Sequence, residues 1–134
     1  MIVIDASILA AYILKEPKWK RLEIFIVSSC SVDLIVKEVA NSIWKAFHRG
    51  LISKDNADKK FLALISLINI NVKLYEQSRI IQEAYTIAMK HNITIYDSIY
   101  IALAKKLKAK LVTLDKRQHL VAKNEGISCE LIVL

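Results

Sequence analysis

Four carboxylates could do chemistry together if the fold brings them to one place. They are Asp5, Glu38, Asp97 and Asp115. Asp5 directly follows the apolar run at residues 2–4, and Asp115 directly follows the apolar run at residues 110–114. If both runs are parallel strands of an open α/β sheet, both acids lie at its carboxyl edge, where such sheets bind ligands. Asp97 opens a predicted helix whose N-terminus we expect at the same edge.

Clustered carboxylates repel one another, and a bound cation is the usual way in which a protein neutralises them. The candidate ligands are all oxygen atoms, so the predicted ion is a hard one, Mg²⁺ or Mn²⁺. The chain itself carries a net charge of +7, which favours an anionic partner and nucleic acid first. An acidic metal site on a basic domain points to a phosphodiester substrate.

Each acid also has a simpler interpretation that does not exclude the first. Asp5 and Asp115 could cap the helices that follow them, with Gln118 at the reciprocal position for Asp115, and Asp97 could be only the acid of the capping box that Thr94 opens. Glu38 taken alone is typical of a solvated helix residue. A capping aspartate can still bind a metal, so the joint placement of the acids carries the hypothesis.

The elements that must position these acids alternate between strand and helix. Apolar runs predict strands at residues 2–4, 28–32, 70–74, 110–114 and 129–133. Helical patterns are found at residues 7–14, 18–27, 33–50, 53–67, 76–91, 94–109 and 117–124. This order predicts an α/β fold, with one parallel sheet flanked by helices on both faces.

The helix that follows Asp33 has two stripes. Asp33 is the expected N-cap, and Gly50 the expected terminating glycine. The apolar stripe consists of Val36, Val39, Ala40, Ile43, Trp44 and Phe47. Glu38, Asn41 and Lys45 form a separate polar stripe, so Glu38 need not face the core.

Composition bounds the class of protein. With 134 residues, one domain over residues 1–134 is expected, and a hydrophobic fraction of 54% excludes a disordered chain. The longest uncharged run, residues 61–72, is too short to span a membrane, and no basic region precedes the apolar N-terminus as in a signal peptide. We therefore expect a cytoplasmic protein without a membrane partner. Cys30 and Cys129 lack zinc-ligand spacing and are expected to be free thiols.

Four segments, in this order and spacing, resemble the PIN-domain family and within it the short VapC-type ribonuclease toxins. They are I-V-I-D-A-S-I-L-A at residues 2–10, D-L-I-V-K-E-V-A-N-S-I-W-K at 33–45, Y-D-S-I-Y-I-A-L-A at 96–104 and L-V-T-L-D-K-R at 111–117. The resemblance implies a single PIN-like nuclease domain with a parallel sheet of about five strands. It also implies an endoribonuclease that depends on Mg²⁺ or Mn²⁺.

Carried over by position, the resemblance assigns the family's acidic residues to the same four carboxylates. Ser7, Asn41 and Thr113 match the positions that support them, and Asn41 and Thr113 could orient a carboxylate. Lys116 and Arg117 stand where some relatives carry a further acid. These two residues and Lys45 are candidates for contact with the RNA backbone.

The resemblance further implies a homodimer and a VapB-like antitoxin whose tail fills the active groove. The helix at residues 76–91 and the helix with Ile99, Leu103 and Leu107 could supply an apolar dimer face, although core packing is the commoner use of such residues. Two rival hypotheses remain. One is a non-catalytic RNA- or protein-binding module with the same fold, and the other is a phosphoacceptor domain, for which a suitable aspartate after a middle strand is lacking.

Overall fold

The computed structural model describes residues 1–134 and contains five strands and seven α-helices. The strands are β1 (Ile2–Ile4), β2 (Ser29–Val32), β3 (Val72–Tyr75), β4 (Lys110–Thr113) and β5 (Cys129–Leu131). The α-helices are α1 (Ala6–Ile13), α2 (Glu23–Ile26), α3 (Leu34–His48), α4 (Lys54–Ile70), α5 (Ile81–His91), α6 (Ile95–Leu107) and α7 (Lys116–Asn124). Two short 3₁₀ turns, η1 (Trp19–Leu22) and η2 (Gln77–Arg79), precede α2 and α5.

The strands form one parallel sheet in the order β3-β2-β1-β4-β5, which confirms the predicted fold class. The central strand β1 pairs with β2 on one side and with β4 on the other, so Val3 lies beside both Cys30 and Leu111. The chain leaves β1 toward β2 and later returns to β4, which makes the gap between β1 and β4 the switch point of the sheet. In open α/β sheets the ligand crevice lies at such a point.

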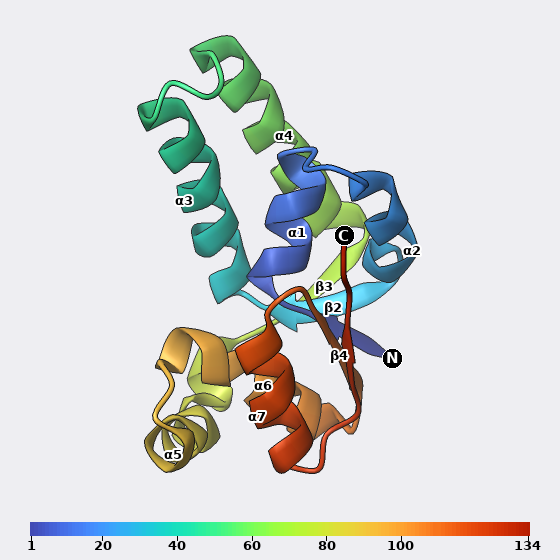
Figure 1. Ribbon diagram of the computed structural model, residues 1–134, viewed down its shortest axis with the longest axis vertical. Coiled ribbons are helices and arrows are strands. Elements are labelled where there is room, and N and C mark those ends of the chain that lie inside the picture. Colours follow the sequence, from blue (N-terminus) through green and yellow to red (C-terminus); the bar gives the residue numbers. More distant parts are fainter.

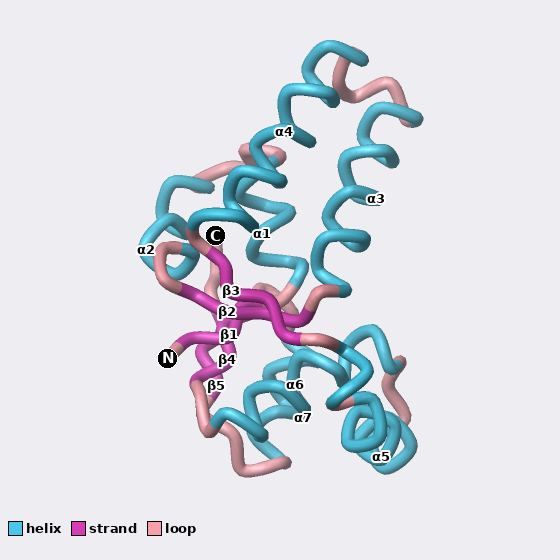
Figure 2. The backbone as a smooth tube through the Cα atoms, turned by 180° about the vertical axis from the view of Figure 1, so that it is seen from behind, coloured by secondary structure: helices cyan, strands magenta, loops and turns pink.

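Helices cover both faces of the sheet. Figures 1 and 2 show α1 to α4 on one face and α5 to α7 on the other. The strands are buried between these layers, as a parallel sheet requires, and Val3 and Ile4 of β1 are fully buried. The helices α3 and α4 run antiparallel and extend together away from the sheet (Figure 1).

Several predicted boundaries shift. The segment predicted as a strand at residues 70–74 starts at Val72, because α4 continues to Ile70 and ends at Asn71. The alternating I-N-I-N stretch at residues 68–71 is compatible both with the end of a helix and with the start of a strand. The predicted helices at 18–27 and 76–91 each divide into a 3₁₀ turn followed by an α-helix.

Two expectations about α3 hold only in part: Asp33 is its N-cap residue and Val39 and Ile43 are buried, but two details differ. Asp33 does not cap the helix with its side chain; its Oδ1 instead accepts the backbone N–H of Gln77 at 3.1 Å, which ties the end of β2 to the turn after β3. The apolar stripe also does not stay in the core. Trp44 is 54% exposed and Phe47 is 42% exposed, because this part of α3 lies beyond the sheet in the α3–α4 extension.

The dimer face suggested on α6 is contradicted. Ile99 and Leu103 are fully buried, and Leu107 packs against the same core. Core packing therefore accounts for these side chains. Both cysteines are free and buried, as expected. No helix in the structure combines the length and the apolar character that crossing a membrane requires.

Candidate active site

Asp5 is a buried carboxylate at the carboxyl end of the central strand. It follows β1, caps α1 and is only 4% exposed. Its Oδ1 accepts the Ser7 hydroxyl at 2.5 Å and the backbone N–H of Ile8 at 3.3 Å, and its Oδ2 accepts the Thr113 hydroxyl at 2.5 Å. The capping role and the site role therefore coexist, and Ser7 and Thr113 hold the two oxygens of this carboxylate.

Burial raises the pKa of Asp5 to about 6. The hydrogen bonds from Ser7, Thr113 and Ile8 lower this pKa, while the negative charge of Asp115 raises it further. Asp5 forms no ion pair with a basic side chain. The charge on Asp5 is thus stabilised by neutral donors alone, and it remains uncompensated within the chain.

Asp115 lies beside Asp5, at the end of the neighbouring strand. It caps α7, and its Oδ1 accepts the backbone N–H groups of Arg117 at 2.8 Å and Gln118 at 3.1 Å. The Thr113 hydroxyl, which donates to Asp5, also accepts the backbone N–H of Asp115 at 3.0 Å. Thr113 therefore couples the two acids across the switch point. The reciprocal half of the capping box does not form, since the buried Oε1 of Gln118 has no partner and its side chain makes no bond to Asp115.

Glu38 is not a solvated helix residue. It is half-buried on α3, and its Oε1 accepts the hydroxyl of Tyr100 on α6 at 2.5 Å. Burial raises the pKa of Glu38, the Tyr100 bond lowers it, and the charges of Asp97 and Asp5 raise it. Glu38 thus lies within electrostatic reach of two other acids of the set.

Asp97 completes the set from the first turn of α6. Its backbone N–H donates to the Thr94 hydroxyl at 3.3 Å, so Thr94 is the N-cap and Asp97 occupies the predicted capping-box position. Burial raises the pKa of the half-buried Asp97, and the charge of Asp115 raises it further. Arg117 has a smaller, opposite influence on this pKa.

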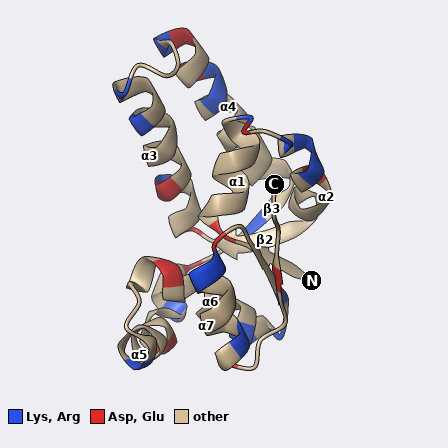
Figure 3. Cartoon of the chain, viewed as in Figure 1, with Lys and Arg blue, Asp and Glu red and all other residues tan.

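The four acids therefore influence one another at a shared edge of the sheet, where β1 and β4 end and α6 begins. In Figure 3 acidic segments meet in the middle of the molecule, beside the basic first turn of α7. The acids do not form a closed cage, because no three His, Cys, Asp or Glu side chains are arranged to enclose a metal ion. Their donor chemistry, carboxylate oxygen only, fits Mg²⁺ or Mn²⁺ rather than a softer metal.

An open cleft of about 540 Å³ is lined by Glu38 but not by the other three acids. Residues of α1, α3 and the first turn of α6 line it, among them Ser7, Glu38, Asn41, Lys45 and Tyr96. Lys45 lines the same cleft as Glu38, so a basic and an acidic side chain share it. Asn41 lines the cleft but makes no hydrogen bond to Glu38, which leaves its predicted orienting role without support.

The two other basic candidates lie in the first turn of α7 and are exposed. The guanidinium of Arg117 donates to the backbone oxygen of Asn92 at 2.7 Å, whereas Lys116 makes no ion pair. Lys116 is therefore the freer of the two for contact with a ligand.

Sequence reasoning missed Tyr100. The residue stands three positions after Asp97 in Y-D-S-I-Y, one helical turn along the same face of α6. That spacing could have drawn attention to it. Its partner on α3 could not be inferred, because the two residues are 62 positions apart in the sequence. Burial and the charge of Glu38 raise the pKa of Tyr100, so its phenol remains a donor.

Comparison with known proteins adds three findings. A family model described as "PIN domain" matches residues 2–124. The chain is 34% identical to Ribonuclease VapC3 of Pyrobaculum aerophilum over 119 residues, which cover 87% of this chain and 90% of the relative. It is also 35% identical to Ribonuclease VapC1 of Mycobacterium tuberculosis over 99 residues, which cover 73% of this chain and 68% of the relative.

The fold is also similar to a solved structure. The crystal structure of PAE2754 from Pyrobaculum aerophilum superposes with a TM-score of 0.69 and 23% sequence identity, over 96% of this chain and 89% of the other. At that identity the likeness concerns the fold. The fold as a whole is thus shared with a solved protein.

Proposed function

Because the chain belongs to the PIN-domain family, with VapC-type ribonucleases among its relatives, we propose that it is a metal-dependent endoribonuclease. Its substrate would be the phosphodiester backbone of RNA, and its role that of the toxin in a VapBC-type toxin–antitoxin pair. One observation carries the proposal. A buried carboxylate, Asp5, lies at the switch point of the sheet without a cationic partner, within reach of three further acids.

The cofactor that fits this donor set is Mg²⁺, with Mn²⁺ as a substitute. We assign its ligands to Asp5, Glu38, Asp97 and Asp115. The chain engages only one oxygen each of Glu38 and Asp115, so the other oxygen of each is free for a cation. Both oxygens of Asp5 accept hydrogen bonds, but Oδ2 has a single donor and keeps a second lone pair that could bind the ion. When bound, such a cation supplies Lewis acidity toward water and toward the phosphoryl oxygens.

The chain's own residues then bind and orient the substrate. Lys45 lines the cleft beside Glu38, and Lys116 and Arg117 flank Asp115, so a phosphate backbone that crosses the acids would meet positive charge on both sides. The N-terminus of α7 also faces this edge, where a helix favours an anion. Ser7 and Thr113 keep Asp5 in one orientation.

Two protein partners belong to the proposal. The first is a VapB-like antitoxin that covers the active groove. The second is another copy of this chain, for which α5 offers exposed apolar side chains at Ile81, Tyr85 and Met89, four residues apart on one face. This stripe replaces the contradicted face on α6. We also propose that the protein acts in the cytoplasm.

The competing hypothesis is a non-catalytic RNA- or protein-binding module. A binder gains nothing from uncompensated acids at a sheet edge, and their repulsion lowers the stability of the fold. RNA binding without metal, combined with the absence of cleavage and of any thermal shift on addition of Mn²⁺, would favour this alternative.

The test is cleavage of a structured RNA by the purified protein with Mg²⁺ or Mn²⁺. We expect cleavage that stops when a chelator is added. Asp97→Asn should be inactive, and Asp58→Asn should be fully active, because Asp58 is an exposed acid paired with Lys54 on α4. Equal cleavage rates for Asp97→Asn and the parent would refute the proposal.

A further inference from the structure

We propose that Tyr100 is a positioning residue of this site, which holds one oxygen of Glu38 and leaves only the other free for the cation. The inference rests on the proposed function and deepens it. It assigns to a buried tyrosine the supporting role for which Asn41 was the expected candidate.

The placement of Tyr100 is unusual for a polar side chain. It is 2% exposed and part of the apolar core cluster, yet its hydroxyl reaches out of that core to Oε1 of Glu38 at 2.5 Å. A tyrosine has only two side-chain torsions, and a ring packed in the core cannot turn without disturbing its neighbours. The position of the hydroxyl is therefore fixed by the core, and a hydrogen bond to a carboxylate is among the stronger ones.

This bond joins the two layers of helices. Glu38 is on α3, which covers one face of the sheet, and Tyr100 is on α6, which covers the other (Figures 1 and 2). Asp97 lies one turn before Tyr100 on α6. The bond therefore sets the position of Glu38 relative to Asp97, the acid that shares its electrostatic environment.

The other acids show the same design. Asp5 has the Ser7 and Thr113 hydroxyls, and Asp115 has two backbone N–H groups of α7. Each of these donors binds a defined oxygen, both oxygens in Asp5 and one in Asp115. Tyr100 is the corresponding donor for Glu38, so Oε2 is the oxygen left to face a cation.

The test removes the hydroxyl and keeps the ring. We expect Tyr100→Phe to bind Mn²⁺ roughly 10- to 100-fold more weakly by calorimetry in the absence of RNA, as for donors that orient metal ligands elsewhere. We expect kcat for RNA cleavage to fall by a similar factor, with KM changed less than about threefold because the RNA-binding lysines are untouched.

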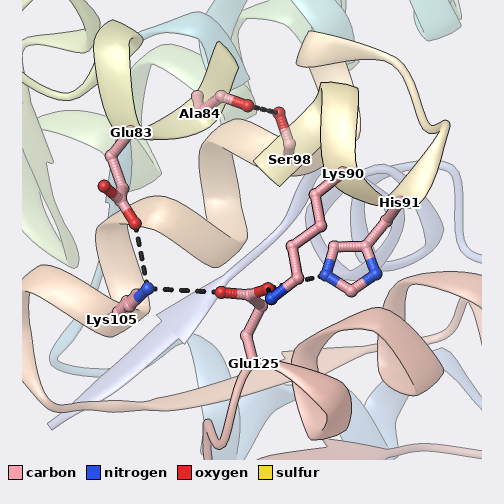
Figure 4. Close-up of polar contacts among 7 residues, drawn as sticks. All are labelled: Glu83, Ala84, Lys90, His91, Ser98, Lys105 and Glu125. Atoms are coloured by element: carbon pink, nitrogen blue, oxygen red, sulfur yellow. Dashed lines mark hydrogen bonds and ion pairs between the residues drawn. The ribbon is translucent and has the colours of Figure 1, made fainter. Parts of the chain in front are cut away.

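The matched control is Ser98→Ala. Ser98 lies on the same helix, is fully buried, and donates its hydroxyl to the backbone oxygen of Ala84 at 2.7 Å (Figure 4). Ser98→Ala also removes one buried hydroxyl and should destabilise the fold. The Ser98 hydroxyl makes no hydrogen bond to any of the four acids, so its loss should not affect their positions. Its Mn²⁺ affinity should equal that of the parent, which separates positioning from general stability.

Two further experiments test the inference, and the first of them keeps it falsifiable if Tyr100→Phe does not fold. Glu38→Asp retains a carboxylate at a half-exposed position but shortens it by one methylene, so it cannot keep the Tyr100 bond and the same cation position together. It should lose Mn²⁺ affinity at least tenfold, whereas parent-like affinity would overturn the inference. In a Glu38→Gln background, Tyr100→Phe should cause no further loss of Mn²⁺ affinity, and an equal further loss would also overturn it.

Failure of the two proposals can be told apart. A parent protein that binds Mn²⁺ and cleaves RNA, together with a Tyr100→Phe variant that does both equally well, overturns only the role of Tyr100. A parent that neither binds Mn²⁺ nor cleaves RNA overturns the proposed function and the role of Tyr100 with it.

Discussion

Two buried carboxylates in this protein have opposite surroundings. Asp5, at the switch point of the sheet, accepts only neutral donors, and burial raises its pKa to about 6. The side chain of Glu125, after α7, is 6% exposed but lies among cations (Figure 4). Its carboxylate oxygens lie 2.6 Å from Nε2 of His91 and 3.2 Å from Nζ of both Lys90 and Lys105.

These contacts hold the pKa of Glu125 down, at about 2, with the hydrogen bond from His91 as the largest cause. The cluster joins the C-terminal ends of α5, α6 and α7, since its members come from all three. Lys105 extends it to Glu83 on α5 at 3.0 Å. Glu125 therefore has its counter-charges within the chain and serves to fasten helices together.

The difference separates an acid whose counter-charges lie within the chain from an acid that we propose to bind a metal. Both groups are acids withdrawn from water, and burial by itself disfavours the charge of each. Basic side chains of the chain surround Glu125 but form no ion pair with Asp5. This is so although the chain carries a net charge of +7 and has many lysines. The proposed metal site rests on this difference, because a counter-charge for Asp5 would have to come from outside the chain.

The largest expected difference between the two regions is in catalysis. Asp5→Asn and Asp97→Asn should each lower the rate of RNA cleavage by at least about 100-fold, because each removes a charge needed for the cation. Glu125→Gln should stay within about threefold of the parent at a temperature where it is folded. Initial rates on one RNA substrate measure all three, and a parent-like Asp5→Asn would break the distinction.

Metal-dependent stabilisation should follow the same division. Mn²⁺ at about 100 times its Kd should stabilise the parent by about 2.7 kcal/mol, and Glu125→Gln by the same amount. Asp5→Asn should gain little at that concentration. Thermal melts with Mn²⁺ and with chelator give the three differences. If Mn²⁺ no longer stabilised the Glu125→Gln variant, the metal would bind near Glu125, and the proposed site at Asp5 would be contradicted.

Without metal, the same two substitutions should change stability in opposite directions. At pH 8 with chelator, Asp5→Asn should raise the free energy of unfolding by about 1–3 kcal/mol, because it removes a buried charge from a carboxyl whose pKa burial raises to about 6. Glu125→Gln should lower it by about 1–2 kcal/mol, a value reduced because the lysine partners are largely exposed. Urea unfolding measures both, and destabilisation in both variants would contradict the comparison.

The smallest effects should appear in the pH dependence of stability. Ionised Asp5 destabilises the folded state above pH about 6, so the advantage of Asp5→Asn should shrink as pH falls through 6 and vanish near the ordinary pKa of 3.8. The contribution of Glu125 is present above its ordinary pKa of 4.5 and is lost as pH falls toward 2. Unfolding series from pH 8 to pH 3 with chelator test this order, and an advantage of Asp5→Asn that grows toward acid pH would contradict it.

Local features of this fold were predictable from the sequence. Asp5 and Asp115 were placed correctly because each follows an apolar run and precedes a helix, a pattern that depends only on neighbouring residues. The order of strands and helices likewise predicted the parallel sheet. Thr113 was expected to support an acid, and its hydroxyl donates to Asp5 and accepts the backbone N–H of Asp115.

Features that depend on distance in space were not predictable. The partner of Glu38 is Tyr100 rather than Asn41, because the N-terminal parts of α3 and α6 meet at the sheet edge. The spacing of neighbouring residues in the sequence cannot predict this contact. Asp33 has a cap-like sequence context but bonds to Gln77 instead. Trp44 belongs to the apolar stripe of α3 but is exposed, because α3 extends beyond the edge of the sheet.

The most direct measurement is an anomalous difference map from a crystal of the parent protein soaked in Mn²⁺. The account predicts one strong peak at the carboxyl edge of β1 and β4, about 2 Å from oxygens of Asp5 and Asp97. It predicts no peak at Glu125, whose counter-charges are already in place. A well-ordered crystal with no peak between Asp5 and Asp97, or with its strongest peak at Glu125, would contradict the proposed metal site.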